Sequence, residues 1–354
     1  MKNLKARLLI VMGIVAASAT VFAQEVPPKS LSVTEMKSKD LMGAPRKVFI
    51  NNFKIYYQMI AEAEKTVHGG RQLGGGSYTG NATARLAVGV EGLDPEDLQS
   101  LTDKIYADYI ASLQTLGLEV HTARDIPNIP FYEEYQKLDG PRINQEQVEG
   151  SLMVVPSDFS YYVKKVTSKG KEKAGGFMAT VTSVNGATAQ EFSTALYHKG
   201  LPKISKDLDD MIVVDVAVNV LSIYLDPKSQ LGTAKVKGGA YLRIQNGRAT
   251  YSSGKGNKPG AAYPEAAVEM LLTQPLAING VFKSEEFKAV ATKSRTTVPS
   301  YAPFFTVEDK TVELSNTIEC DAAVYKEKVG ATVEAFLNAT MAKFEIGLKG
   351  EKAK

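Results

Sequence analysis

MIVVDVAVNVLSIYL, residues 211–225, is the most apolar run in the interior of the chain. Valine and isoleucine dominate this run, and Asp215 and Asn219 interrupt it. Continuous β-branched runs of this kind are typical of strands that are buried on both faces. We therefore predict that residues 211–225 form the central strand of a sheet, which ends at Asp226-Pro227.

Alternating apolar and polar residues on both sides of this run predict further strands. The longer segments with this pattern are 48–67, 82–90 and 236–251. Asn246-Gly247 interrupts the last segment, and because Asn-Gly between alternating residues is a strong hairpin signal, we predict a turn there. For residues 56–66 a helix is the alternative, since Ala and Glu favour helices. Shorter strands are predicted at 118–120, 152–155 and 177–184.

Asp94 marks the start of the clearest helix. It is a favoured N-cap residue, Pro95 suits the first helical position, and Gly117 is a typical stop signal. Apolar residues recur between them at helical spacing. We predict helices over residues 94–116 and 321–344, the second beginning at Asp321, and short helices over 131–138 and 264–272. Residues 281–298 fit a strand or a helix equally. The fold class that follows is α/β (α+β), a mixed β-sheet with packed helices.

The N-terminus has the three parts of a cleaved export signal. Lys2, Lys5 and Arg7 precede an apolar stretch that ends in small residues at Ala23. We predict a signal peptide over residues 1–23, a flexible lead-in over 24–45, and a tail over 347–354. Residues 46–346 form one large α/β domain, or two intimate halves with a boundary near 140–150. The expected location is the periplasm or the periphery of the outer membrane, with secretion as the alternative.

Charge and cysteine content exclude several classes of protein. The chain has 42 basic and 39 acidic residues, and removal of the three bases in the signal leaves equal numbers. General nucleic-acid or anionic-membrane binders keep a basic excess, so neither class is favoured. Cys320 is the single cysteine and has no partner for an intramolecular disulfide. No interior run is long and apolar enough to form a membrane-spanning helix.

Glycine-rich loops contain the candidate ligand-binding residues. The segment 68–80 resembles a phosphate-binding loop in its glycines, but it lacks the lysine and the following helix that such a loop needs. A flexible hairpin loop is the simpler interpretation. If either glycine-rich loop binds a ligand, the expected residues are His68, Arg71, Ser77 and Tyr78 in the first and Lys255 in the second. The sequence contains no metal-ligand spacing around its three histidines, so no catalytic residue, metal or cofactor is predicted.

The order of elements resembles the periplasmic α/β domain of the curli-secretion channel CsgG and the amino-terminal domain of TolB. The features that carry this likeness cover about half the chain: the opening strand 48–53, the helix 94–116 with Gly117-Leu118-Glu119-Val120, the strand 211–225, the hairpin at Asn246-Gly247 and the C-terminal helix. The resemblance implies a non-catalytic envelope scaffold that docks partners through sheet edges or helices. The chain lacks a lipid-anchor cysteine, inserts a glycine-rich loop, and shows no predicted pair of membrane-spanning hairpins. Neither the pore function nor any functional residue is therefore transferred.

The function expected from these features is that of an exported, non-catalytic binding or scaffold component of a periplasmic or outer-membrane-associated assembly. Its partners would be other envelope proteins or further copies of the chain, with peripheral membrane association left open and no nucleic acid involved. The competing class is an exported hydrolase acting on cell-wall or polysaccharide material, with a site near 68–80 or 254–260. A third class is a carrier of a small ligand.

Overall fold

The computed structural model describes residues 26–68, 70–71, 78–79, 81–173, 200–230, 233–256, 266–292, 302–307 and 310–352. They form a mixed α/β fold in which one large sheet has the strand order β1-β16-β15-β14-β2-β10-β9. These strands are β1 (Leu31–Met36), β16 (Ala266–Leu272), β15 (Thr233–Ser253), β14 (Ile212–Gln230), β2 (Lys47–Gln58), β10 (Ser151–Val155) and β9 (Arg142–Val148). The predicted central position is confirmed, because β14 lies in the middle of this order. The predicted end at Asp226-Pro227 is wrong, because β14 continues to Gln230 and pairs with β15 throughout.

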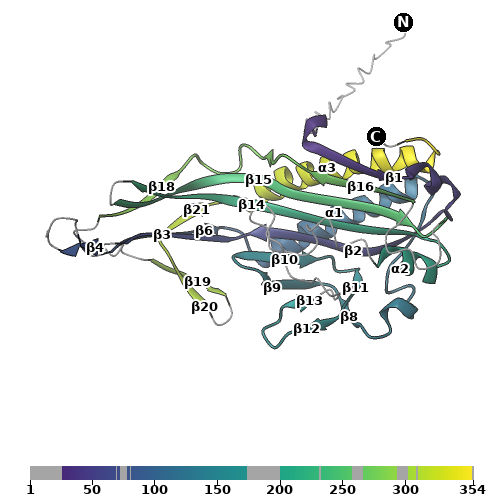
Figure 1. Cartoon of the computed structure of the whole chain (residues 1–354), viewed down its shortest axis with the longest axis horizontal. Helices are drawn as coiled ribbons and strands as arrows, with labels where there is room; N and C mark the ends of the chain where they lie inside the picture. Colours follow the sequence, from purple (N-terminus) through teal and green to yellow (C-terminus); the bar gives the residue numbers. More distant parts are fainter. Residues whose placement is uncertain are drawn as a thin grey trace, which may run out of the picture.

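Two long helices cover one face of the sheet. They are α1 (Pro95–Thr115) and α3 (Ala322–Leu348), and both begin at the aspartates predicted from the sequence. Asp321 accepts hydrogen bonds from the backbone N of Ala323 and Val324 at 2.9 and 3.1 Å. The apolar core lies between these helices and the sheet, where the rings of Tyr251 and Phe344 stack with centroids 4.1 Å apart. Figure 1 shows both helices lying along the sheet.

Short elements cover the opposite face. Helix α2 (Leu201–Asp207) and the 3-10 helix η3 (Pro130–Tyr132) pack there in a second, smaller apolar cluster with Phe49 and Val213. Small two-stranded pairings lie beside them: β8 (Gln136–Asp139) with β11 (Ser160–Val163), and β12 (Lys165–Val166) with β13 (Glu172–Lys173). Strand β7 (Glu119–His121) and strand β17 (Leu276–Ala277) extend the large sheet beside β2 and β15. Together the three layers make the body of the molecule.

A narrow arm projects from the body (Figure 1). One of its layers contains the distal half of β14, the start of β15, and β18 (Glu286–Thr292), which pairs with β15. The other layer is the three-stranded sheet β21-β6-β3, formed by β21 (Asn316–Glu319), β6 (Ala82–Glu91) and β3 (Ile60–Val67). The short pairs β4 (Gly70–Arg71) with β5 (Tyr78–Thr79) and β19 (Ala302–Val307) with β20 (Lys310–Leu314) adjoin this layer. The arm therefore extends the central strands of the fold beyond the helices.

The lead-in contains regular structure. Strand β1 pairs antiparallel with β16, from Leu31 opposite Leu272 to Met36 opposite Ala267. Two 3-10 helices, η1 (Pro28–Ser30) and η2 (Ser38–Gly43), flank it. Leu41 in η2 is fully buried, so this segment covers one end of the sheet.

The predicted hairpin at Asn246-Gly247 is wrong. Strand β15 runs straight through both residues, which lie opposite Asn219 and Val218 of β14. Gly247 serves packing, because a Cβ atom there would lie 2.7 Å from the ring of Phe336 in α3. The hairpin that joins β14 to β15 lies instead between Gln230 and Thr233.

Several other local predictions also differ from the structure. The predicted helix at 264–272 is strand β16, whose apolar residues fill an inner position of the sheet. The predicted helix at 131–138 is only the 3-10 turn η3 followed by β8. Residues 56–66 belong to β2 and β3, so the helical alternative there is wrong. The strand predicted at 177–184 lies outside the described residues.

Candidate functional site

The arm leaves the body where β2 separates from β14. Gln58 ends β2, and its Oε1 accepts hydrogen bonds from the backbone N of Ser222 and Ile223 at 3.1 and 3.0 Å. The backbone N atoms of the two residues after Gln58 donate to the carbonyl of Gly150 at 2.8 and 2.9 Å. These contacts satisfy backbone groups that lose their strand partner at the branch. The direction of the arm is therefore fixed by hydrogen bonds at its base.

Small residues allow the two layers of the arm to approach closely. Gly238 in β15 is the clearest case, because a Cβ atom there would lie 2.4 Å from Leu225 and 3.3 Å from Leu86 of the opposite layer. Buried alanines and valines line the remaining inner positions: Ala82, Ala84, Val88, Ala234, Val236 and Ala291. The inner faces thus form a thin apolar core, and the polar residues of the same strands point outward.

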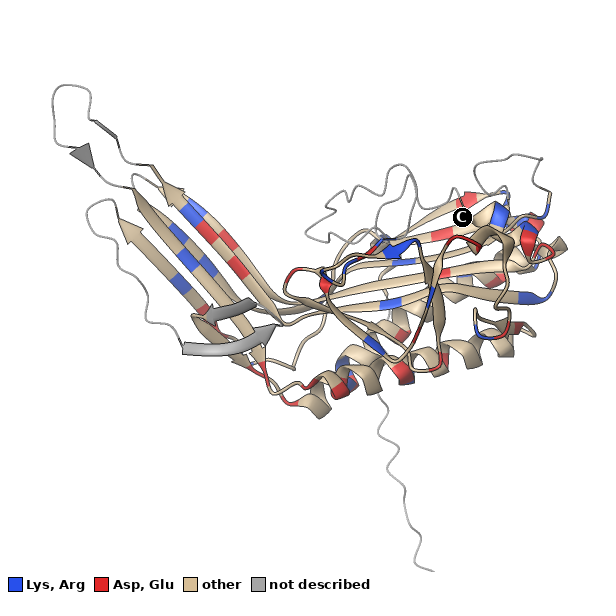
Figure 2. Cartoon of the chain, turned by 90° about the horizontal axis from the view of Figure 1, so that it is seen from below, with Lys and Arg blue, Asp and Glu red and all other residues tan. Residues whose placement is uncertain are grey.

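The outward side of β14, β15 and β18 in the arm is basic. We call this surface the basic face and define it by Lys228, Lys235, Lys237 and Lys288. The same side also carries Asp226, opposite Lys237, and Glu286, two residues before Lys288, so the four lysines outnumber two carboxylates. Lys228 lies directly opposite Lys235, and Lys237 directly opposite Lys288. In the described part of the chain, Lys228 alone of the four forms an ion pair, at 2.7 Å with Asp226. Figure 2 shows charged residues of both signs on the strands of the arm.

The lysines of the basic face repel one another. Like charges directly opposite each other on neighbouring strands are destabilising. Desolvation lowers the pKa of Lys235, and the positive charges of Lys237, Lys288 and Lys228 lower it further, against the opposing effect of the Asp226 carboxylate. An incoming negative charge would relieve this repulsion, so the basic face is suited to an anionic partner.

Exposed apolar side chains lie on the basic face as well. Tyr241 in β15 is 41% exposed and Val290 in β18 is 42% exposed, although large apolar side chains in the described residues are mostly buried. Val290 lies opposite Lys235, and the guanidinium of Arg243 lies over the Tyr241 ring, 4.7 Å from its centroid. Tyrosine and arginine are enriched at protein–protein interfaces, whereas lysine is depleted, so the Tyr241–Arg243 pair is the part of this surface that is typical of an interface.

The outward side of the other layer is acidic. We call it the acidic face and define it by Glu62 and Glu64 of β3, both exposed. Arg85 of the neighbouring strand β6 lies opposite Glu64 and forms an ion pair with Glu62. Two carboxylates against one guanidinium leave a net negative charge. Leu314 and Ser315 pack over β6 nearer the body, so the acidic face occupies the distal part of this layer.

Strand edges in the arm are partly unpaired. In the described residues β3 pairs only with β6, and β14 pairs only with β15 beyond the point where Val220 lies opposite Tyr57 of β2. Unpaired edges present backbone donors and acceptors to another chain. The edge at β3 carries the charged residues of the acidic face, which is one way in which proteins limit non-specific pairing.

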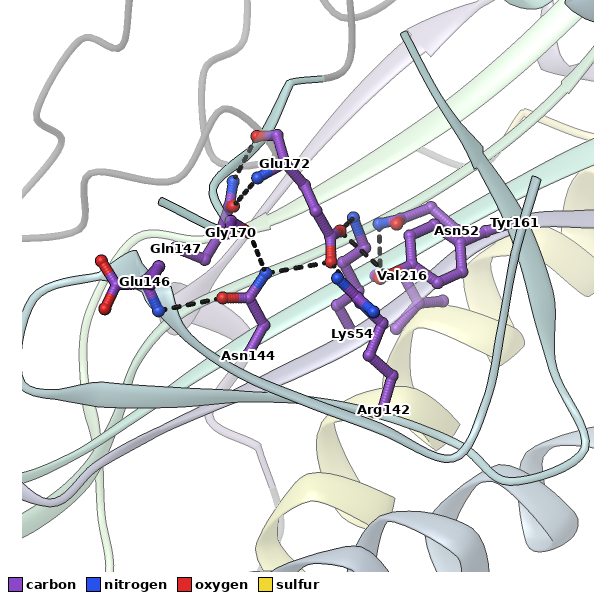
Figure 3. A network of polar contacts seen from close by, with 10 residues as sticks. All are labelled: Asn52, Lys54, Arg142, Asn144, Glu146, Gln147, Tyr161, Gly170, Glu172 and Val216. Carbon is purple, nitrogen blue, oxygen red and sulfur yellow. Dashed lines mark hydrogen bonds and ion pairs between the residues drawn. The ribbon is translucent and has the colours of Figure 1, made fainter. Parts of the chain in front are cut away.

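A second concentration of polar groups lies in the body, around the buried carboxylate of Glu172 (Figure 3). Its Oε1 accepts hydrogen bonds from Arg142 Nε at 2.7 Å and Asn144 Nδ2 at 3.0 Å. Its Oε2 accepts a hydrogen bond from the Tyr161 hydroxyl at 2.9 Å and lies 3.7 Å from Lys54 Nζ. The ammonium of Lys54 also lies over the Tyr161 ring, 4.6 Å from its centroid.

The same cluster binds the backbone of Glu172. The Gln147 side chain both accepts a hydrogen bond from Glu172 N at 2.9 Å and donates one to Glu172 O at 3.1 Å. Asn144 donates to the carbonyl of Gly170 at 3.0 Å. Side-chain amides thus replace a strand partner and hold the segment containing β12 and β13 against β9.

The Glu172 cluster is suited to a structural role. Burial alone raises the pKa of the carboxyl, but Lys54, Arg142, Asn144 and Tyr161 outweigh it and lower the pKa below its ordinary value. An ionised carboxylate with both oxygens hydrogen-bonded is a poor proton donor or acceptor near neutral pH. The cluster therefore anchors a hairpin to the body.

The candidate ligand-binding residues lie at opposite ends of the molecule. His68 follows β3 at the tip of the arm and is exposed. Arg71 and Tyr78 lie in the small pair β4 and β5 near it, while Ser77 lies outside the described residues. Lys255 is exposed beyond the far end of β15, a strand of 21 residues. Because a strand rises about 3.3 Å per residue, roughly 65 Å separate the two ends, and Lys255 belongs to a different region.

The described residues contain no group of three or more potential metal ligands. None of the helices in this part of the chain is both long and apolar enough to cross a membrane. Burial, followed by the charges of Asp321 and Asp97, raises the pKa of Cys320 to about 12, so its thiol is protonated near neutral pH.

Comparison with known proteins adds no assignment. No family model matches the chain, and neither a curated protein nor a solved structure does. The resemblance to the periplasmic domain of CsgG and TolB stays a prediction from the order of elements.

Proposed function

We propose that this chain is an exported, non-catalytic protein that acts as a binding or scaffold component of a periplasmic or outer-membrane-associated assembly. The arm is the part that engages the partner. The body, with its helices packed on the sheet and its anchored hairpin, provides a rigid base for the arm.

The basic face is the observation that carries this proposal. Four lysines and two exposed apolar side chains share one outward surface, although opposed lysines reduce the stability of a sheet. Residues that reduce the stability of a fold are often found at binding sites, because function and not stability selects them there. An exposed tyrosine beside an arginine, on a surface that projects away from the body, favours recognition of another macromolecule.

A photo-crosslinking experiment in cells tests the proposal. A photoreactive amino acid is introduced at Tyr241, and in a second strain at Ile143 of β9, which is exposed to a similar degree (41% and 37%) but lies on the body. We expect irradiation to crosslink the Tyr241 variant to an envelope protein or to another copy of the chain. The Ile143 variant serves as the matched control and should give far less product.

Absence of crosslinks from Tyr241, with normal export of the variant, would contradict the proposal. Equal crosslinking from both positions would also contradict it, because the arm would then have no special role.

A further inference from the structure

The two outward faces of the arm carry opposite charge, so each face could bind the other face of a second copy. We propose that the basic face of one copy docks on the acidic face of a second copy. This inference rests on the proposed function and names a second copy of the chain as the partner. The contact joins different surfaces of the two copies, so it repeats from copy to copy and builds a ring or a filament.

Charge complementarity is the first argument. Lys235, Lys237 and Lys288 form no ion pair among the described residues, while Asp226, which lies opposite Lys237, pairs with Lys228. On the opposite layer Glu62 and Glu64 outnumber Arg85, which is paired with Glu62. Docking would bring the unpaired lysines to the acidic face and relieve the repulsion between Lys237 and Lys288.

Matching spacing is the second argument. Lys235 and Lys237 are two residues apart on β15, and Glu62 and Glu64 are two residues apart on β3, with each pair on one side of its strand. Residues at this separation lie about 6.6 Å apart along any strand, so the two rows of charge have the same repeat. Stacked sheets that pack face to face at about 10 Å would place one row over the other.

The exposed apolar residues add to this contact. Tyr241 and Val290 lie on the basic face and would lose exposed apolar surface when a second arm covers it. Exposed ion pairs contribute little individually and are screened by salt. The association should therefore be weak at high ionic strength and stronger at low ionic strength.

Charge reversal of each face provides the test. The first variant is K235E/K237E/K288E and the second is E62K/E64K. Sedimentation velocity at low ionic strength measures the association of each purified full-length variant. We expect each variant alone to associate on the order of tenfold or more weakly than the wild-type chain, because like charges then face each other. Circular dichroism and thermal unfolding confirm that each variant is folded.

The decisive measurement is made on a mixture of the two variants. One variant then carries two acidic faces and the other two basic faces, so alternating copies attract each other. We expect the mixture to associate about as strongly as the wild-type chain, and more strongly than either variant does alone. The control K165E/K169E/K173E changes the same number of exposed lysines on the body and should associate as the wild-type chain does.

Four results would overturn the inference. The first is unchanged association of the single variants, and the second is failure of the mixture to recover it. Crosslinking of Tyr241 to a different envelope protein, with no self-association, would overturn the second copy as partner and leave the proposed function intact. Binding of the wild-type chain to anionic phosphatidylglycerol vesicles, lost in the lysine variant and accompanied by no self-association, would also overturn it.

Discussion

Glu172 is the residue on which the polar interior of the body depends. Its carboxylate contacts two cations, Lys54 and Arg142, and its side chain is only 1% exposed. Removal of its charge leaves Lys54 buried at 7% side-chain exposure without that partner. Breaking one side of a buried ion pair is costly because the remaining charge stays desolvated.

We therefore expect E172Q to lower the free energy of unfolding by about 3 kcal/mol in urea denaturation at neutral pH. The control is E134Q, which removes an exposed ion pair with Lys164 and should leave the urea midpoint unchanged. Equal midpoints for E172Q and the wild-type chain would contradict a structural role for the cluster.

The contribution of Glu172 should also depend on pH. Its pKa in the folded chain lies below the ordinary value of 4.5, which applies to the unfolded chain. This contribution to stability is complete above pH 4.5. Below pH 4.5 the unfolded chain takes up a proton before the folded chain does, so the contribution decreases as the pH approaches the pKa of Glu172 in the folded chain. We expect the stability difference between wild type and E172Q to be largest at neutral pH and to shrink below pH 4.5. A difference that grows on acidification would show that the folded pKa is raised.

No local pattern in the sequence indicates these polar partners. Lys54, Arg142 and Glu172 are far apart along the chain, and each occurs in an ordinary polar context. The lysines of the basic face are partly visible as Lys235 and Lys237 on one side of a strand. Lys288 joins them only through the pairing of β18 with β15, which local pattern does not specify.

Packing of β15 against α3 shows how one glycine can mislead local prediction. Asn246-Gly247 has the composition of a tight turn, but the chain uses Gly247 where the Phe336 ring approaches the strand. Long-range packing therefore overrides the local signal. The helix predicted at 264–272 is wrong for a similar reason, because its apolar residues fit a strand between β1 and β15. Helices α1 and α3 were predictable because their caps and apolar spacing are local features.

The packing role of Gly247 gives a prediction for this pair of elements. We expect G247A to lower the free energy of unfolding by about 2 kcal/mol, because the added methyl group overpacks the contact with Phe336. In the double variant G247A/F336L the smaller side chain makes room for the methyl group, so its loss should be less than the sum of the two single losses. Chemical denaturation of all four chains measures this coupling. Simple additivity of the losses would show that the ring and the glycine do not interact.

At the scale of the whole molecule, the fold separates a helix-covered body from an arm with two charged faces. The fold class and the central position of β14 could be predicted, since both follow from hydrophobic pattern. The arm could not be predicted, because it begins where β2 stops pairing with β14 and the next strand, β3, pairs with β6. Of the candidate ligand-binding residues, His68 lies at the tip of this arm, while Lys255 lies at the other end of the sheet.

Gentle cell fractionation, followed by sizing of the exported protein by sedimentation, is the most direct test of the assembly role. The account predicts recovery in an envelope fraction, in a particle well above the 38.3 kDa mass of the chain. Recovery as a free monomer in the soluble exported fraction, at both low and high ionic strength, would contradict it.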